Sequence, residues 1–463
     1  MPCCTSEGRD KRMVQSSRER RTRRRFACAG LLLALLLSLG LTGCQVIRSV
    51  MDLFQATVEA TPAPTAVPLP TVQPTVEPET PAPTATATPE AIASPTETPA
   101  VATESATATA VAAATRVVPP QETINLPPGF GISVFHAGLS DSRMMTLGPE
   151  GTLYVAERGA GRIVRLPDRD GDGVADTVEV AADGLRAPSS LDFYTDGSLY
   201  VGETARILRL SDPDGDGVFQ EREVIIDGLP SGGHSTRTVL VSPDGTYLYV
   251  SIGSSCNVCI EEDERRSTIM RYNPDGSGGE IYAEGLRNAV GITFRPGTDE
   301  LWATNNGRDW LGDDQPPETV YIVQQGDDAG WPRCHAARIV DPEYGETGAC
   351  ESVAAPEVEM QAHTAPLGLG FYTGEQFPEE YRGDLFVALH GSWNRSVPVG
   401  YKVVRIPIEN GQAGGVQDFA VGWLRDNGSN WGRPVDVVTG ADGSLFVSDD
   451  TGGVIYRIFY TTD

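Results

Sequence analysis

The chain has 463 residues and a formal net charge of −27, from 63 acidic residues and 36 Lys and Arg residues. Residues 1–43 carry nine of the basic residues and three of the acidic ones, so a chain without them would have a net charge of −33. Nucleic acids and anionic membrane surfaces bind basic patches, and this charge balance excludes both as expected partners.

The N-terminus has the order of a lipoprotein export signal. A basic run at Arg18–Arg25 precedes an apolar run at Phe26–Leu41, and the letters LTGC that end at Cys44 resemble a bacterial lipobox. The apolar run is short for a membrane-spanning helix. We predict a signal peptide over residues 1–43, acylation of Cys44, and a lipid-anchored protein on the extracytoplasmic face of a bacterial cell envelope. An uncleaved anchor is the alternative, and the basic run also resembles a twin-arginine signal.

A low-complexity linker follows, which we assign to residues 44–119. From Ala56 to about Pro119 it is almost wholly Thr, Pro, Ala, Val, Glu and Ser, without an aromatic residue. Such a composition cannot bury enough apolar surface to offset the entropy of the chain. We therefore predict an extended, disordered stalk between the membrane and a folded domain at 120–463.

Four cysteines lie in the folded part, Cys256, Cys259, Cys334 and Cys350. Because the N-terminus predicts export to an oxidising compartment, we expect two local disulfides, Cys256–Cys259 and Cys334–Cys350. The second would close a short loop, worth about 3 kcal/mol in the chain-entropy model. A zinc site from the same four residues is the alternative, although the interval after the first CxxC is longer than in a zinc ribbon.

One pattern recurs six times between about Ile124 and Tyr460. An apolar strand is followed by a turn with Gly and an acidic residue, and then by a strand that opens with Leu and an aromatic residue, as in LGPEGTLYVAE. Repeats of about 40–50 residues are typical of propeller blades. No long stretch has a helical period, so we predict an all-β, six-bladed β-propeller with a site at one end of its central channel. The second strands are predicted to begin at Leu153, Leu199, Leu248, Leu301, Leu385 and Leu445.

Two acidic loops match the calcium-loop template D-x-D-x-D-G-x5-E. Strands rather than helices flank them, so we predict calcium-binding hairpin loops with a structural role in two successive blades. An acidic, solvated turn is the alternative. The ligands predicted by the template are Asp168, Asp170, Asp172 and Glu179 in the first loop, and Asp212, Asp214, Asp216 and Glu223 in the second.

Several loops next to predicted strands carry polar side chains that suit catalysis. His234 lies in the letters GGHSTR, and a neutral imidazole can accept a hydroxyl proton near pH 7. Arginines that converge on one mouth of a propeller would form an anion site. Each of these residues alone is more commonly a packed or surface residue, so the hypothesis depends on their combination. The arginines in blade-connecting loops are Arg287, Arg308, Arg395 and Arg433.

Six motifs, in order, carry a family resemblance: GGHSTRTVLVSPDG, GLRNAVGITFRP, NNGRDWLGDD, GWP, LHGSWNR and WGRPVDVVTGADGSLFVSDDTGG. Together they resemble the soluble glucose/sorbosone dehydrogenase family that depends on pyrroloquinoline quinone (PQQ), nearest its sorbosone-dehydrogenase-like branch. The resemblance covers roughly Leu126 to Tyr460. It implies a six-bladed propeller that oxidises a sugar by hydride transfer to the quinone, with a calcium ion that polarises this cofactor and an electron acceptor that it does not name.

The resemblance also implies roles for individual residues. His234 resembles the general base, and Arg287 and Asn288 resemble the pair that contacts the quinone. The backbone carbonyls of Gly307 and Arg308 match the calcium-binding turn. Arg433 matches an arginine that pairs with a carboxylate of the cofactor, and His390 and Arg395 lie in its expected binding region.

Two positions depart from the glucose dehydrogenases of this family. Ser254 stands where those enzymes carry an aspartate that orients the histidine, so we expect a weaker base and modest turnover. The segment from His390 to Arg395 stands where they carry a cofactor-binding lysine.

Two other functions are compatible with a propeller of this composition. A calcium-dependent lactonase would need carboxylate and amide ligands in the channel, for which Asn305, Asn306 and Asp309 are available. A non-catalytic surface propeller could bind glycans or protein. The arginine-rich loops favour the quinoprotein, because a tricarboxylate cofactor needs cationic partners and a lactone does not.

Overall fold

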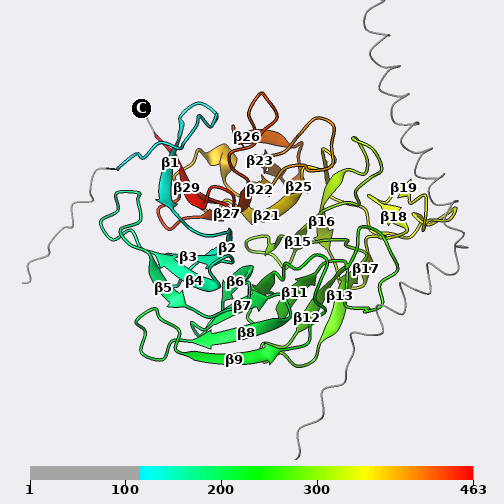
Figure 1. The fold of residues 1–463 in the computed structure, drawn as a ribbon, viewed down its shortest axis with the longest axis horizontal. Coiled ribbons are helices and arrows are strands. Elements are labelled where there is room, and N and C mark those ends of the chain that lie inside the picture. Colours follow the sequence, from blue (N-terminus) through cyan, green and yellow to red (C-terminus); the bar gives the residue numbers. More distant parts are fainter. Residues whose placement is uncertain (1–114, 462–463) are drawn as a thin grey trace, which may run out of the picture. The chain divides into compact units, whose positions relative to one another are not determined.

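The computed structural model describes residues 115–461. They form six antiparallel sheets of four or five strands arranged around a central axis (Figure 1), which confirms the predicted six-bladed β-propeller. No helix within this range is long and apolar enough to cross a membrane. The predicted signal peptide, Cys44 and nearly all of the predicted linker lie outside the described residues.

The first three blades follow one another along the chain, each with its strands in sequence order from the channel outward. Blade 3 gains an extra outer strand, β17 (Asp327–Asp328), which pairs in parallel with β13. The strands of these blades are β2 (Ser142–Leu147), β3 (Leu153–Glu157), β4 (Arg162–Leu166) and β5 (Glu179–Ala182); β6 (Ser190–Phe193), β7 (Leu199–Glu203), β8 (Arg206–Ser211) and β9 (Glu221–Ile226); and β10 (Val239–Val241), β11 (Leu248–Ile252), β12 (Thr268–Tyr272) and β13 (Glu280–Glu284).

The remaining blades carry the insertions and close the ring. Two small hairpins and a short 3-10 helix, η1 (Glu379–Tyr381), decorate blades 4 and 5. The blade strands are β14 (Ile292–Phe294), β15 (Leu301–Asn305), β16 (Glu318–Val323) and β20 (Val358–Met360); β21 (Pro366–Phe371), β22 (Leu385–Leu389), β23 (Lys402–Ile406) and β26 (Gln417–Val421); and β27 (Pro434–Thr439), β28 (Leu445–Asp449), β29 (Val454–Tyr460) and β1 (Phe130–Ala137). The hairpins are β18 (Cys334–His335) with β19 (Ile339–Val340), and β24 (Ile408–Glu409) with β25 (Gln412–Ala413).

The second strand of every blade begins at the leucine predicted from the repeat. Five of these strands are buried along their whole length, because neighbouring blades cover both of their faces. The same packing explains why the first four residues of these strands are apolar or small rather than alternating. Three of the strands end in a buried carboxylate, Glu157, Glu203 or Asp449. The long interval before Leu385 contains an insertion with the Cys334–Cys350 loop.

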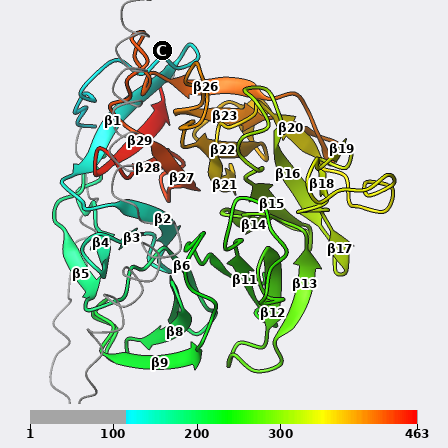
Figure 2. The same ribbon diagram turned by 45° about the vertical axis from the view of Figure 1, so that its right-hand side comes forward.

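The N-terminal strand closes the ring. β1 pairs antiparallel with β29, from Phe130 opposite Tyr460 to Ala137 opposite Val454, so blade 6 combines both ends of the folded chain. Figure 2 shows the N-terminal strand beside the C-terminal strands. The segment before β1 is already bound to it, since the Val118 backbone nitrogen donates to Ser133 Oγ at 2.8 Å.

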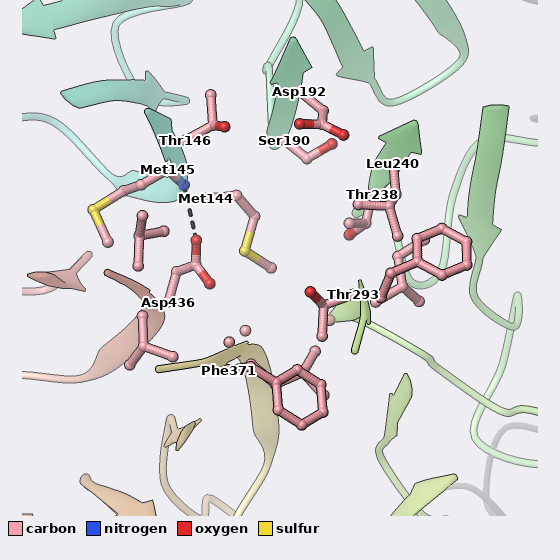
Figure 3. A pocket seen from close by; sticks show the side chains of 18 of the residues that line it. Met144, Met145, Thr146, Ser190, Asp192, Thr238, Leu240, Thr293, Phe371 and Asp436 are labelled. Atoms are coloured by element: carbon pink, nitrogen blue, oxygen red, sulfur yellow. Dashed lines mark hydrogen bonds between the residues drawn. The ribbon is translucent and has the colours of Figure 1, made fainter. Parts of the chain in front are cut away.

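The first strands of the blades line a central channel, which contains a cavity of about 340 Å³ (Figure 3). Apolar side chains from five blades meet inside the ring, namely Met144, Leu191, Val290, Leu367 and Val435. The cavity is lined along the first strands, from Thr238 and Gly291 at their starts to Leu147, Phe294 and Thr439 at their ends. His234, Arg287 and Arg433, which precede these strands, are not among its lining residues.

Two carboxyl groups in the channel connect neighbouring blades. Asp436 accepts a hydrogen bond from the Met145 backbone nitrogen at 2.8 Å, and Asp192 accepts one from the Val241 nitrogen at 2.8 Å. Burial raises the pKa of each carboxyl to about 7. Because each accepts from the first strand of the next blade, we assign both a structural role.

Candidate functional site

The predicted site residues lie at one face of the propeller. His234 precedes β10, the pair Arg287 and Asn288 precedes β14, and Arg433 precedes β27. Successive strands of a blade run in opposite directions, so the start of a first strand and the end of a second strand lie at the same face. Gly307, Arg308 and His390 follow second strands and therefore join the others there.

Ser254 fixes the imidazole of His234. The Nδ1 atom lies 2.9 Å from the Ser254 Oγ and 3.1 Å from the Ser254 carbonyl oxygen. The hydroxyl of Ser254 donates its single proton to the carbonyl of Cys256 at 2.7 Å, so it can only accept from the imidazole. Nδ1 therefore carries the proton, and Nε2 keeps the lone pair that a general base needs.

Two buried arginines hold the loop around His234. Arg237 donates to the carbonyl oxygen of His234 at 3.0 Å, and Arg266 donates to those of Gly232 and Gly253 at 2.9 and 3.2 Å. In the part of the chain that the structure describes, both guanidinium groups bind backbone carbonyls rather than carboxylates. Among the described residues, neither of these two guanidinium groups forms a hydrogen bond with a carboxylate, so both bring positive charge close to His234.

This charge and the burial of the loop keep His234 neutral. Burial, followed by the positive charge of Arg287, lowers the pKa of His234 to about 4, and Arg266 and Arg237 act in the same direction. At pH 7 the imidazole is therefore unprotonated at Nε2 in nearly every molecule. A base of this kind is available over a wide pH range but has a low affinity for its proton.

Arg287 is 5% exposed, and its neighbours hold it firmly. Its Nε donates to the Asn257 carbonyl at 2.9 Å, and its Nη2 donates to Asn257 Oδ1 and Asp309 Oδ2, each at 3.0 Å. Nη1 has only a long contact, 3.4 Å, with the carbonyl of Asn306. The Nη1 edge is thus the part of this guanidinium that can still donate to a ligand.

Asn288 lies beside His234 across Gly253. A Cβ atom at Gly253 would stand 2.4 Å from Asn288 Oδ1 and 2.6 Å from His234 Cβ, so only glycine lets these side chains approach one another. The Asn288 backbone nitrogen donates to Asn305 Oδ1 at 3.1 Å. The structure therefore brings together His234, Arg287 and Asn288 as the sequence predicted.

The turn at Gly307 and Arg308 leaves its carbonyl groups free. Neither carbonyl accepts a hydrogen bond from another described residue, whereas the Gly307 nitrogen donates to Glu318 Oε2 at 2.7 Å. Burial raises the pKa of Glu318 to about 7. The guanidinium of Arg308 points elsewhere, to Asp341 and Glu343 of the insertion.

Arg433 and His390 lie together on a neighbouring part of the face. Arg433 Nε and Nη2 donate to the carbonyls of His390 and Gly391 at 3.0 and 3.2 Å, and the described residues provide no acceptor for its Nη1. His390 Nε2 lies 2.8 Å from Asp450 Oδ2. Arg143 binds the same carboxylate oxygen at 2.9 Å. His390 is thus already committed to an ion-pair cluster, while Arg433 keeps one free edge.

Arg395 is occupied by a loop of blade 4. Its Nη1 donates to the carbonyl of Asp313, its Nη2 to Asp314 Oδ1 at 3.1 Å, and its Nε to the carbonyl of Val397 at 3.2 Å. These contacts leave little of the guanidinium for a cofactor. In this structure Arg395 joins two loops.

The two acidic hairpin loops bring together three of their four predicted ligands. The carboxylates of Asp168, Asp170 and Asp172 lie within 4.8 Å of one another, as do those of Asp212, Asp214 and Asp216. The glutamates of the template do not join them, which corrects that part of the prediction. Glu179 lies opposite Arg165 in the β4–β5 ladder and pairs with it at 2.6 Å, and Glu223 lies opposite Arg209 in the next blade.

Both predicted disulfides are present, Cys256–Cys259 and Cys334–Cys350. The first positions a residue that the sequence analysis did not single out, Asn257. Its side-chain oxygen accepts from Arg287 and from the Asp309 nitrogen at 2.7 Å, and its Nδ2 donates to the Asp309 carbonyl at 3.1 Å. The sequence signal for it was its place between two cysteines three residues apart.

A family model described as TrAA12-like matches residues 124–461 of the chain. The chain belongs to the TrAA12-like family. An uncharacterised protein of Borreliella burgdorferi is 30% identical over 353 residues, which cover 73% of this chain and 91% of the relative. A pyrroloquinoline quinone-dependent pyranose dehydrogenase of Coprinopsis cinerea is 26% identical over 410 residues, covering 73% of this chain. This chain spans only 55% of the length of that enzyme.

Two solved structures share the fold. The PQQ domain of the Coprinopsis cinerea pyranose dehydrogenase, in its holo form, has a TM-score of 0.65 and 23% identity, covering 75% of this chain and 99% of that domain. The calcium structure of a Trichoderma reesei family AA12 carbohydrate-active enzyme has a TM-score of 0.63 and 21% identity, covering 73% of this chain and 97% of that one.

Proposed function

We propose that this protein is a PQQ-dependent sugar dehydrogenase that requires calcium and oxidises a sugar of the aldose or sorbosone type. The observation that carries the proposal is His234, a neutral base whose Nε2 is left free by its contacts with Ser254, in a loop held by arginines without carboxylate partners. The Coprinopsis relative, a PQQ-dependent pyranose dehydrogenase, supports the same reaction class.

The residues present fit both groups. A tricarboxylate quinone needs hydrogen-bond donors and positive charge. Arg287 Nη1 has only a long contact of 3.4 Å with the Asn306 carbonyl, and the side-chain nitrogens Arg433 Nη1 and Asn288 Nδ2 have no acceptor among the described residues. Calcium binds oxygen ligands, and the carbonyls of Gly307 and Arg308 are unused, with the carboxyl group of Glu318 beside them. When bound, the quinone would accept a hydride from the sugar, and calcium would polarise its carbonyl group.

The chain's own residues would supply the proton chemistry and the electrostatics. His234 Nε2 accepts the proton of the sugar hydroxyl that is being oxidised, while Ser254 keeps Nδ1 protonated and the ring oriented. Arg287 is fixed by Asn257 and Asp309 before the reaction, so its charge stabilises a developing anion without reorganisation.

Reconstitution tests the proposal directly. Adding PQQ and calcium to the purified full-length chain is expected to change the absorption spectrum of the quinone, and the mixture should reduce an artificial electron acceptor with at least one sugar in an aldose panel. A chain that neither binds the quinone nor oxidises any sugar would contradict the proposal and favour a non-catalytic binding propeller. Calcium-dependent hydrolysis of a lactone without quinone would favour the lactonase.

The sequence before residue 115 supports a further proposal, that the mature protein is anchored outside the cytoplasmic membrane through acylated Cys44. Cys44→Ala should then move the protein from the membrane fraction to the soluble fraction after cell lysis. Retention of this variant in the membrane fraction at the wild-type level would contradict the anchor. Cys334→Ala, which keeps the lipobox, is the matched control.

A further inference from the structure

Two large aromatic side chains are exposed at the rim of the site. Trp310 is 66% exposed and Trp393 is 67% exposed, although Trp side chains usually lie mostly buried. Their rings contact each other edge to face, with centroids 5.2 Å apart and planes at 87°. They come from different blades, since Trp310 follows β15 and Trp393 follows β22.

Polar contacts hold this pair in place and connect it with the site. Asp309, next to Trp310, accepts from Asn394 Nδ2 at 2.8 Å, and Asn394 is next to Trp393. The other oxygen of the same carboxylate accepts from Arg287 at 3.0 Å. Arg395 donates to the carbonyl of Asp313, and the Ser396 backbone nitrogen donates to its carboxylate, so the loop after β22 is also bound to the loop after β15. The backbone next to each indole is therefore tied to the site: Trp310 follows Asp309 of the ion pair, and Trp393 precedes Asn394, which donates to Asp309.

We propose that Trp310 and Trp393 form a carbohydrate subsite that stacks a pyranose ring beyond the one being oxidised. This inference rests on the proposed function and narrows its substrate class to neutral oligosaccharides with equatorial hydroxyl groups. Such a pyranose ring has apolar C–H faces that suit an indole, and its edge carries hydroxyl groups that suit carboxylates. Asp314, whose side chain is 87% exposed beside this rim, supplies a carboxylate of that kind.

The chemistry of the rim favours a sugar over a protein partner. A protein interface of useful affinity buries a broad apolar core around its aromatic anchors. Here the surroundings of the two indoles are polar, with Asn394, Ser396 and Asp314 next to them. The location of the two indoles also suits an oligosaccharide. Asp309, next to Trp310, binds Arg287, and Arg287 lies near His234 in the candidate site.

Calorimetry with the intact protein, without quinone, tests the subsite independently of turnover. Cellotetraose and maltotetraose are the probes, since the first has only equatorial linkages and the second has axial ones, and glucose is the monosaccharide reference. At least one tetrasaccharide should bind more tightly than glucose. The double substitution Trp310→Ala with Trp393→Ala should raise the Kd for that tetrasaccharide about tenfold, which corresponds to a loss of about 1.4 kcal/mol in binding free energy. Trp310→Phe and Trp393→Phe should retain most of it.

Val397→Ala is the matched control, because Val397 is 66% exposed close to Trp393 and has no indole. In the reconstituted enzyme the double variant should raise KM for the tetrasaccharide and leave both kcat and the KM for glucose unchanged. Equal loss for glucose and tetrasaccharide, or no tetrasaccharide binding by the wild type, would overturn the subsite. Slower reoxidation by a protein electron acceptor with unchanged sugar binding would overturn it too and indicate a protein-docking role. Because the calorimetry is done without quinone, it tests sugar binding at this subsite even if the protein does not oxidise any sugar.

Discussion

Replacing His234 by alanine is expected to lower kcat of the reconstituted enzyme by about 10²–10⁴-fold, the usual contribution of a positioned general base. Ser254 commits Nδ1 of His234 as a donor and leaves Nε2 unprotonated, so Nε2 can accept the hydroxyl proton of the sugar. Turnover with an artificial electron acceptor, at saturating PQQ and calcium, measures the effect. A loss of less than about tenfold would show that another group takes the proton.

The pH profile offers a second measurement for the same residue. A base acts when it is unprotonated, so lowering its pKa moves the acid limb of kcat/KM to lower pH. With a pKa of about 4 for His234, the rate should stay level from about pH 8 to pH 5.5 and fall only below that. Ser254→Asp is the informative variant, because a carboxylate at Nδ1 favours the protonated ring and should move the acid limb toward higher pH. An acid limb near pH 6.5 in the wild type would contradict the electrostatic account.

Replacing Arg287 by alanine is expected to cost about 10²–10³ in kcat, the usual effect of removing one preorganised donor from a developing charge. The substitution removes a buried cation and leaves Asp309 without its ion-pair partner. Arg287→Lys should recover part of the activity, since it keeps the charge and loses the planar fork that binds Asn257 and Asp309 together.

The pH profile separates this electrostatic role from a structural one. Arg287 is the charged group that contributes most, after burial, to lowering the pKa of His234. Its removal should therefore shift the acid limb of the remaining activity to higher pH, which a mere loosening of the loop would not do. Thermal unfolding of the variant, compared with wild type, shows whether the fold is retained. An unchanged acid limb together with a large loss of stability would assign Arg287 to the scaffold.

The blades could be predicted because their pattern follows from burial. A second strand covered on both faces is apolar or small over most of its length, and the six leucines that begin these strands are visible in the sequence for that reason. The candidate base and its arginine were visible as polar residues in glycine-rich or strand-flanking loops. The orientation of the His234 imidazole by Ser254 could not be predicted. It depends on the hydrogen bond that the Ser254 hydroxyl donates to the Cys256 carbonyl, which the sequence does not show.

Other parts of the site depend on contacts between loops that are far apart in the sequence. Asn257 and Asp309 meet from blades 3 and 4, and Asn394 reaches Asp309 from blade 5. In the acidic hairpin loops, by contrast, the local sequence template predicted one ligand more than the structure brings together. The spacing of Glu179 satisfied the template, but the antiparallel register places it directly opposite Arg165, and cross-strand pairing of unlike charges determines its partner.

The pairing of β1 with β29 also determines when this protein can fold. The strand that completes the last blade comes from the beginning of the domain, so the ring cannot close until the final residues of the chain have been made. Contacts between segments so distant along a chain form slowly, and strand edges stay exposed until they have formed. A nascent chain that lacks β29 therefore has an open last blade with unpaired strand edges. Until Tyr460 pairs with Phe130, these edges can pair with other chains, so aggregation is expected to compete with folding.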